Sequence, residues 1–285
     1  GSRIAYLSCV RGQWDIWTMH LDGTDKINLT NDLAEEGPPQ WSPDGKLILF
    51  TKQHPHWNVW VTCGDAVYQA QLTREGDNLY PSWGSDGKKI VFSSNRAGRW
   101  DVWIMNVDGT NQAQLTRALG NNIKPQLSPD GKRIVFLSDR LGYGYWHVWC
   151  MNADGSDPYM MLKRVEHDQD LVVGGVADDA DPSWSPDGKN ILFQTRWVSE
   201  EIGVFEFTSK GYNETIFMMD STAGVHSMDI VAISTYPEAK RGASNETQTV
   251  WSPDGGKIAF ISDRSGNLDI WVLSFEGFKA PVAAY

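Results

Sequence analysis

The sequence lacks any apolar run of the roughly 18 residues that a membrane-spanning helix needs, so we expect no such helix. It is also poor in positive charge, because 25 Lys and Arg stand against 36 Asp and Glu and give a formal net charge of −11 at pH 7. An acidic chain without a basic cluster repels nucleic-acid phosphates, which argues against a nucleic-acid partner. Its three cysteines, Cys9, Cys63 and Cys150, are in no metal-ligand spacing, and we expect packed thiols.

Several catalytic signatures are absent as well. No Gly-x-Ser-x-Gly nucleophile elbow occurs, so the sequence holds no hydrolase half of the kind found in propeller-gated peptidases. No phosphate-binding loop and no zinc-binding spacing of Cys and His occurs either. These absences favour a binding module over a hydrolase or a nucleotide-dependent enzyme.

Tryptophan is abundant, with 14 residues, and most of them recur at fixed places in a repeat. One pentapeptide, Trp-Ser-Pro-Asp-Gly or a close variant, stands at 41–45, 83–87, 127–131, 184–188 and 251–255. An apolar run follows each copy, then in most units an aromatic segment such as Trp100-Asp-Val-Trp103, and in several a second Asp-Gly turn. Pro, Asp and Gly in this order are typical of tight turns between short strands. Each unit therefore predicts four short antiparallel strands, which is the size of one β-propeller blade.

The repeat predicts an all-β fold, a six-bladed β-propeller of four-stranded antiparallel blades in a single domain over 1–285. The blades are placed at about 1–33, 34–76, 77–120, 121–176, 177–243 and 244–285. The chain begins at the second strand of a unit, so we expect the ring to be closed by both termini, with Lys279–Tyr285 supplying the missing strand. Seven blades stay open, because the long spacing between Trp184 and Trp251 could contain a degenerate unit.

The repeat resembles the TolB-like β-propeller family. The resemblance rests on the five turn pentapeptides, the Asp-Ile-Trp-like third strands, and the Ser-Asp-Arg motifs at 138–140 and 262–264, with a near match at 94–96. It covers nearly the whole chain and implies the propeller fold. Members of the family suggest three kinds of function: protein binding, as in periplasmic TolB, gating of a peptidase, and polysaccharide lyase activity. The resemblance also implies a periplasmic or extracellular location, and we expect any signal peptide to lie outside this sequence.

In four-stranded antiparallel blades the two kinds of Asp-Gly turn share one face. The loops that join the second strand to the third, and one blade to the next, share the other, which we call the loop face and expect to bind ligand. Candidate ligand-binding residues there are tryptophans that can stack on sugar or peptide, arginines that can bind anions, and one histidine. They are Trp57, Trp100, Trp146, Trp197 (placed in the loop of the fifth blade), Arg96, Arg140, Arg264 and His226. A purely structural role stays open as the alternative. In it, the tryptophans pack on the aliphatic parts of arginine side chains, and the arginines stabilise the blade edge through hydrogen bonds.

Two sets of residues could bind a cation. A polar acceptor stands five residues before each innermost strand, at Glu36, Asn78, Asn122, Asp179 and Glu246. The carboxylates Glu36, Asp179 and Glu246 are expected at the channel mouth, where they could bind calcium or a ligand ammonium, or accept from loop N–H groups. The histidines His54, His56, His147 and His167 also map to the loop face and could bind a transition metal if they converge.

Two long segments, 164–181 and 208–249, flank the fifth blade, and we expect the ligand to lie against them. Two functions remain open. The first is a non-catalytic binding or interaction module for a protein or peptide, acting through the loop face and channel mouth. The second is a carbohydrate-binding or polysaccharide-lyase-like propeller with a metal-assisted site. No catalytic residue is assigned.

Overall fold

The computed structural model describes residues 2–10, 12–117, 120–142, 144–161, 176–198, 213–221, 230–233 and 246–275. Every regular element in these ranges is a β-strand. Accordingly, the described residues contain no helix that is long and apolar enough to cross a membrane. The chain divides into two compact units, Gly1–Phe136 with Asn152–Ser156, and Leu137–Met151 with Asp157–Tyr285. The boundary falls inside β14 (Arg133–Ser138).

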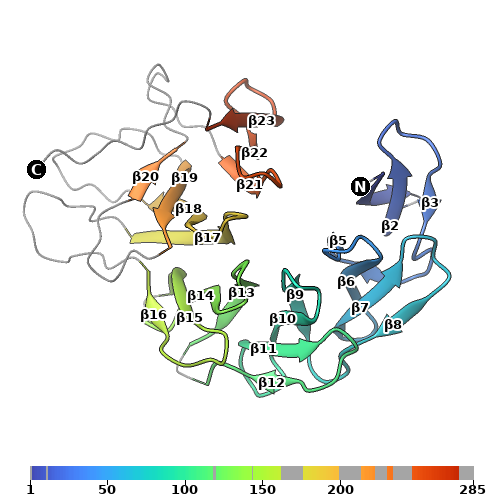
Figure 1. Ribbon diagram of the computed structural model, residues 1–285, viewed down its shortest axis with the longest axis horizontal. Helices are drawn as coiled ribbons and strands as arrows, with labels where there is room; N and C mark the ends of the chain where they lie inside the picture. The colour runs from blue at the N-terminus through green and yellow to red at the C-terminus, as the bar shows by residue number, and fades with distance from the viewer. Residues whose placement is uncertain are drawn as a thin grey trace, which may run out of the picture. The chain divides into compact units, whose positions relative to one another are not determined.

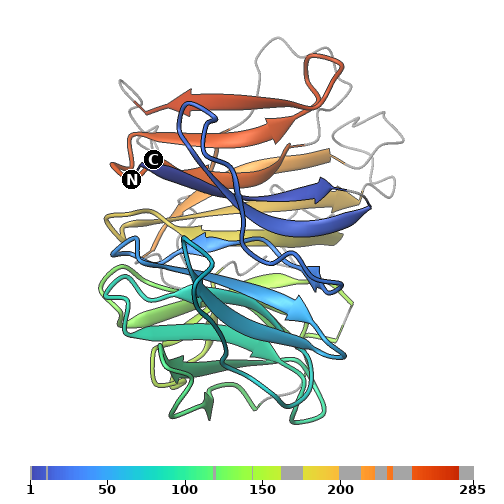
Figure 2. The same ribbon diagram turned by 90° about the vertical axis from the view of Figure 1, so that its right-hand side faces the viewer.

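Unit 1 begins with three sheets (Figure 1 and Figure 2). The first contains β1 (Arg3–Val10), β2 (Gln13–His20) and β3 (Ile27–Asn28). The second contains β4 (Glu35–Glu36), β5 (Gln40–Trp41), β6 (Leu47–Gln53), β7 (Trp57–Cys63) and β8 (Gln69–Gln71). The third contains β9 (Asn78–Trp83), β10 (Lys89–Ser94), β11 (Asp101–Asn106) and β12 (Ala113–Gln114), and β13 (Asn122–Leu127) follows it.

Unit 2 carries most of β15 (His147–Asn152), which pairs with β16 (Tyr159–Met160). The next sheet has the order β17 (Val176–Trp184), β18 (Asn190–Val198), β19 (Asn213–Asp220) and β20 (Ile230–Ala232). The last sheet has β21 (Glu246–Trp251), β22 (Lys257–Ser262) and β23 (Asp269–Ser274) among the described residues.

The strand pairing shows which connections lie at each end of a sheet. In the third sheet β10 pairs antiparallel with β9 and with β11, and the β10–β11 register runs from Lys89↔Asn106 to Ser94↔Asp101. The turn pentapeptide and the Asp-Gly turn therefore lie at one end of the sheet, and the β10–β11 loop lies at the other. The predicted separation of turns and loops is thus confirmed within the sheet.

The turn pentapeptide is built by its own side chains. Ser42 Oγ donates to Asp44 Oδ1 over 2.7 Å, and the N–H groups of Lys46 and Leu47 donate back to these two side chains. The hydrogen bond from Ser42 lowers the pKa of Asp44, and Gly45 takes a φ of +71° that glycine adopts without strain. The same bond recurs between Ser128 and Asp130, Ser185 and Asp187, and Ser252 and Asp254.

Neighbouring sheets in a unit pack through apolar side chains. In unit 1, Leu49 and Val59 of the second sheet lie in one buried cluster with Ile90 and Phe92 of the third. Unit 2 has a similar cluster between its last two sheets, formed by Leu192, Ile216, Ile258 and Phe260 with partners. Trp83 and Trp184 are buried, as packing between blades predicts. They are the last residues of β9 and β17, so the expectation that the innermost strands begin five residues after the polar acceptors was wrong.

The fifth repeat departs from the prediction. The β18–β19 hairpin is longer than its counterparts, since pairing runs from Asn190↔Asp220 to Trp197↔Asn213. Trp197 therefore lies within β18, and its placement in the loop was wrong. β19 and β20 fall inside 208–249 and pair antiparallel, as expected for an ordered segment that forms a hairpin. This repeat has no Asp-Ile-Trp-like third strand from which its register could be predicted.

Two other expectations concern the cysteines and the closure of the ring. Cys150 is buried, but Cys9 is exposed, so the expectation of packed thiols is wrong for Cys9. The described residues contain six antiparallel sheets. The count of six blades and the closure by Lys279–Tyr285 stay predictions, because residues 276–285 lie outside the described part.

Candidate functional site

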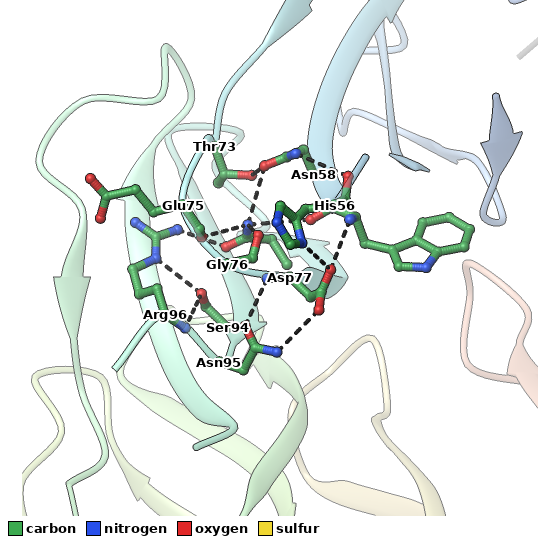
Figure 3. A network of polar contacts seen from close by, with 11 residues as sticks. His56, Asn58, Thr73, Glu75, Gly76, Asp77, Ser94, Asn95 and Arg96 are labelled. Carbon is green, nitrogen blue, oxygen red and sulfur yellow. Dashed lines mark hydrogen bonds and ion pairs between the residues drawn. The ribbon is translucent and has the colours of Figure 1, made fainter. Parts of the chain in front are cut away.

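A polar lock joins the second and third sheets at their loop-face end (Figure 3). It consists of the dipeptide Asp77-Asn78, where β9 begins, and the start of β7. The Trp57 N–H donates to Asp77 Oδ1 over 3.0 Å, and Asn78 Nδ2 lies 3.3 Å from the Trp57 carbonyl oxygen and 3.3 Å from Asn58 Oδ1. Asn58 Oδ1 also accepts from Thr73 Oγ1. The backbone of Trp57 is thus held on both sides of its side chain.

A β-bulge lets the start of β9 reach the neighbouring sheet. The register of β9 against β10 shifts after Leu79, and Tyr80 takes a φ of +52°. Pro81 follows, and because proline has no N–H it fits where the ladder is interrupted. The same pair, a residue with positive φ before a proline, recurs as Lys124-Pro125 and Asp181-Pro182.

Asn95, in the β10–β11 loop, completes the lock on Asp77. Its Oδ1 accepts the Asp77 N–H at 2.7 Å, and its Nδ2 donates to Asp77 Oδ2 at 3.2 Å. Burial alone would raise the pKa of Asp77, but hydrogen bonds from Trp57 and Asn95 and the charge of His56, 3.4 Å away, together lower it. Asp77 is therefore ionised at neutral pH and acts as a fixed acceptor.

Arg96 also stabilises this lock, because it hydrogen-bonds Asn78. Its guanidinium donates to Asn78 Oδ1 at 2.7 Å and to Ser94 Oγ at 2.9 Å, and lies 4.6 Å from the centroid of the Trp103 ring. Burial lowers the pKa of Arg96, partly opposed by Glu75. The other two candidate arginines are stacked similarly, Arg140 4.2 Å from the Trp149 ring and Arg264 4.9 Å from the Trp271 ring. These contacts favour a structural role of the three arginines, at the edges of their sheets, over anion binding.

The lock recurs between β11 and β13. Asn121 Oδ1 accepts the Trp100 N–H at 3.4 Å, and the Asn122 N–H donates to the Trp100 carbonyl oxygen at 2.7 Å. Asn122 Nδ2 donates to Asp101 Oδ1 at 3.2 Å. Here an amide faces a carboxylate, so donor and acceptor are complementary.

In unit 2 the lock joins β15 and β17. Asp178 Oδ1 accepts the Trp146 N–H at 2.7 Å, and the Asp179 N–H donates to the Trp146 carbonyl oxygen at 2.8 Å. Asp179 Oδ2 lies 3.5 Å from His147 Nδ1. At the β11–β13 junction the carboxylate, Asp101, belongs to the earlier strand. Here it is Asp179 of the later strand, β17, and it faces a histidine, so the two side chains are again complementary.

The three locks give Trp57, Trp100 and Trp146 the same local setting. Each is half-buried, and each has its backbone N–H bonded to the residue that precedes the predicted acceptor. Each indole is therefore presented from a fixed backbone at the loop-face end of its own sheet. A rigid aromatic group of this kind binds a ligand with a low ordering cost.

The junction between the first two sheets lacks this complementarity. Glu36 occupies the second position of the lock, and Asp15 holds the repeat position of Asn58, Asp101 and His147, so both positions carry acids. The Glu36 side chain is fully buried, and neither of its oxygens has a hydrogen-bond partner among the described residues. Lys52 Nζ lies 3.8 Å from Glu36 Oε1 and also bonds Asp32. Burial, followed by repulsion from Asp32, raises the pKa of Glu36 to about 7.

Glu36 should therefore make stability depend on pH. Its folded pKa of about 7 exceeds the ordinary glutamate pKa of 4.5, so between these pH values the folded protein holds a proton that the unfolded chain releases. Stability falls as pH rises through this window. Glu36→Gln should be more stable than the parent by about 2 kcal/mol at pH 8 and similar to it near pH 5. Urea unfolding at both pH values measures this, with exposed Glu35→Gln as control. Equal gains at both pH values would contradict the assigned pKa.

The predicted metal sites are not assembled in the part of the chain that the structure describes. No group of three or more His, Cys, Asp and Glu there is arranged to bind a metal ion. His56 and His147 pair with the lock carboxylates, and His54 is exposed. The side chains of Trp197 and Glu246, and all of His167 and His226, lie outside the described residues. Metal binding by the predicted sets stays a prediction.

Sequence reasoning missed the first residue of each lock, which is Asp77, Asn121 or Asp178. A signal was present, since each is an Asp or Asn directly before a predicted acceptor. The partner could not be predicted, because the Trp N–H lies 20 or more positions away along the chain in every case.

Comparison with known proteins shows which family this geometry resembles. The model of the TolB β-propeller domain matches residues 66–164. TolB from Acinetobacter baumannii has a TM-score of 0.67 and 18% identity, over 97% of this chain and 62% of that chain. Residues 66–164 thus resemble the TolB β-propeller domain, and the described residues share the fold of TolB. The predicted resemblance and the all-β propeller fold are thereby confirmed.

Other relatives of this TolB-like propeller differ in function. An oligogalacturonate lyase in complex with manganese has a TM-score of 0.67 and 13% identity, over 98% of this chain and 72% of that one. An uncharacterized peptidase, YuxL, of Bacillus subtilis (strain 168) is 27% identical over 109 residues, which are 38% of this chain and 14% of the peptidase. The chain thus matches less than two thirds of the TolB protein and a small part of the peptidase. The structural likenesses concern the fold alone.

Proposed function

We propose that this TolB-like propeller is a non-catalytic interaction module that binds a protein or a peptide through its loop face and channel mouth. The fold supports an interaction module, and the repeated, locked tryptophans carry the finer proposal. Tryptophan is enriched among the residues that dominate binding energy at protein interfaces, and hydrogen bonds hold the backbones of Trp57, Trp100 and Trp146 in place, which supports the proposal. A periplasmic or extracellular location is part of the proposal and rests on the TolB resemblance.

Selection from a random-peptide display library tests this. Peptides enriched on the immobilised protein should bind Trp57→Ala and Trp100→Ala at least about tenfold more weakly than the parent, because each substitution removes a large rigid contact. The control is Tyr68→Ala, which removes an exposed aromatic at the turn end of the second sheet. Binding that is lost with Tyr68 and kept without the two tryptophans would contradict the use of the loop face.

A second candidate is carbohydrate binding or metal-assisted polysaccharide cleavage. It is favoured by the same half-buried indoles, which can stack on sugar rings, and by the fold shared with the oligogalacturonate lyase. A glycan array with metal analysis of the purified protein separates the two. Uronate binding together with bound manganese, zinc or calcium would favour the carbohydrate candidate.

A further inference from the structure

The β2–β4 junction differs from the three locked junctions at its surface as well as in its interior. Trp14 holds the position of Trp57 but is 48% exposed, and Leu33, in the loop before β4, is 91% exposed. Glu35 holds the position of Asp77, yet its carboxylate has no hydrogen bond or ion pair with a described residue. We name Trp14, Asp32, Leu33 and Glu35 the Trp14 edge.

The loop that carries this edge is anchored at several points. Thr30 Oγ1 accepts the Ile16 N–H at 3.0 Å, and Asp32 Oδ1 accepts the Ala34 N–H at 2.9 Å. Ala34 itself is buried. The exposure of Leu33 therefore belongs to an ordered loop. Leu33 thus stays exposed although the backbone around it is held by hydrogen bonds, so its side chain does not contribute to the packing of its own sheet. Exposed apolar groups surrounded by charged residues often mark contact sites.

The charge around this edge is negative. Asp32 and Glu35 are exposed carboxylates, and Glu36 and Asp15 lie buried below them. The cation seen among these groups is Lys52, which is itself buried and lies between Asp32 and Glu36. β2 and β4 are in contact, and Trp14 and Glu35 stand near the beginnings of these two strands. Carboxylates near an accessible indole face attract a cation in two ways, through charge and through the ring quadrupole.

We propose that the Trp14 edge binds a Lys or Arg side chain that neighbours an apolar residue in a basic segment of a partner protein. The cation lies against Trp14 and the carboxylates of Asp32 and Glu35, and the apolar residue contacts Leu33. The net charge of −11 attracts such a segment and repels an acidic one. This inference rests on the proposed function and names the chemistry of the partner.

Titration calorimetry with a capped nonapeptide of alternating Lys and Leu tests the edge. The parent should bind it with an affinity that falls as salt is added, and a Glu-Leu nonapeptide should not bind. Leu33→Ser and Glu35→Gln change exposed groups, so they should leave the fold intact. Together they should weaken binding by about tenfold or more. Trp14→Ala should do the same.

Matched controls are Leu21→Ser, exposed in the β2–β3 turn at the other end of the sheet, and Glu75→Gln, exposed beside the next lock. Both should bind like the parent. Binding unchanged in the edge variants, or equal for the two nonapeptides, overturns the proposal. If library-selected peptides still depend on Trp57 and Trp100, only this inference fails. If neither peptide class binds, the proposed function fails as well.

Discussion

Gly76→Ala should lower the free energy of unfolding by about 3 kcal/mol, although it adds a single methyl group. Gly76 has a φ of +62°, and a Cβ there would lie 2.6 Å from Asn95 Oδ1 and 2.9 Å from the Arg96 backbone. The positive φ disfavours alanine by about 1 kcal/mol, and the clash with backbone adds at least as much. Asn95 and Arg96 both hold the lock (Figure 3), so the displacement should loosen Asp77 and Asn78 too.

The control for this substitution is Gly98→Ala in the β10–β11 loop. Gly98 has a φ of +96°, and a Cβ there meets nothing within 4 Å. This variant carries only the backbone preference of about 1 kcal/mol. Calorimetry should show a melting temperature lower by roughly 6 °C or more for Gly76→Ala and by about 3 °C for Gly98→Ala. Equal shifts would show that the close approach at Gly76 does not matter.

Asp101→Ala should destabilise the protein by about 3 kcal/mol as well. Asp101 is buried, and it accepts from Thr116 Oγ1 at 2.6 Å, Gln114 Nε2 at 2.9 Å and Asn122 Nδ2 at 3.2 Å. Alanine leaves these three donors without their acceptor, and an unsatisfied buried donor costs about 1–3 kcal/mol, with partial relief from water. Equilibrium unfolding in urea measures the loss.

Asp101→Asn is the informative comparison. The preceding repeat has Asn58 at this position, where it accepts from Thr73 and Asn78. An asparagine at 101 keeps one acceptor oxygen for Thr116, so the loss should be about half of that in Asp101→Ala. A loss as large as that of the alanine variant would mean that the charge of Asp101, and not its acceptor geometry, stabilises the junction.

The sequence predicted the fold because each unit carries its own turn chemistry. Ser42 and Asp44 close a turn within a few residues of each other, so their role can be read without knowing what packs nearby. The third strands could be found wherever their Asp-Ile-Trp-like motif exists. In the fifth repeat, which lacks this motif, the prediction failed and Trp197 was misplaced.

The candidate site was predicted less completely because it is formed between sheets. The tryptophans and arginines were found by their repetition. The stacking of Arg96 on Trp103, however, and the capture of the Trp57 N–H by Asp77, depend on how two sheets approach. The setting of Glu36 was hidden for the same reason. In the sequence it looks like a surface acid, and only the packing shows that it is buried without a hydrogen-bond donor among the described residues and near the charge of Asp32.

The most direct test of the central claim is hydrogen–deuterium exchange with and without a library-selected peptide. The claim predicts slower exchange on binding in the loop-face segments around 54–58 and 95–101, beside the locked Trp57 and Trp100. It predicts no change in the turn pentapeptides at 41–45 and 83–87, at the other end of the same sheets. Protection confined to those turns would contradict the account.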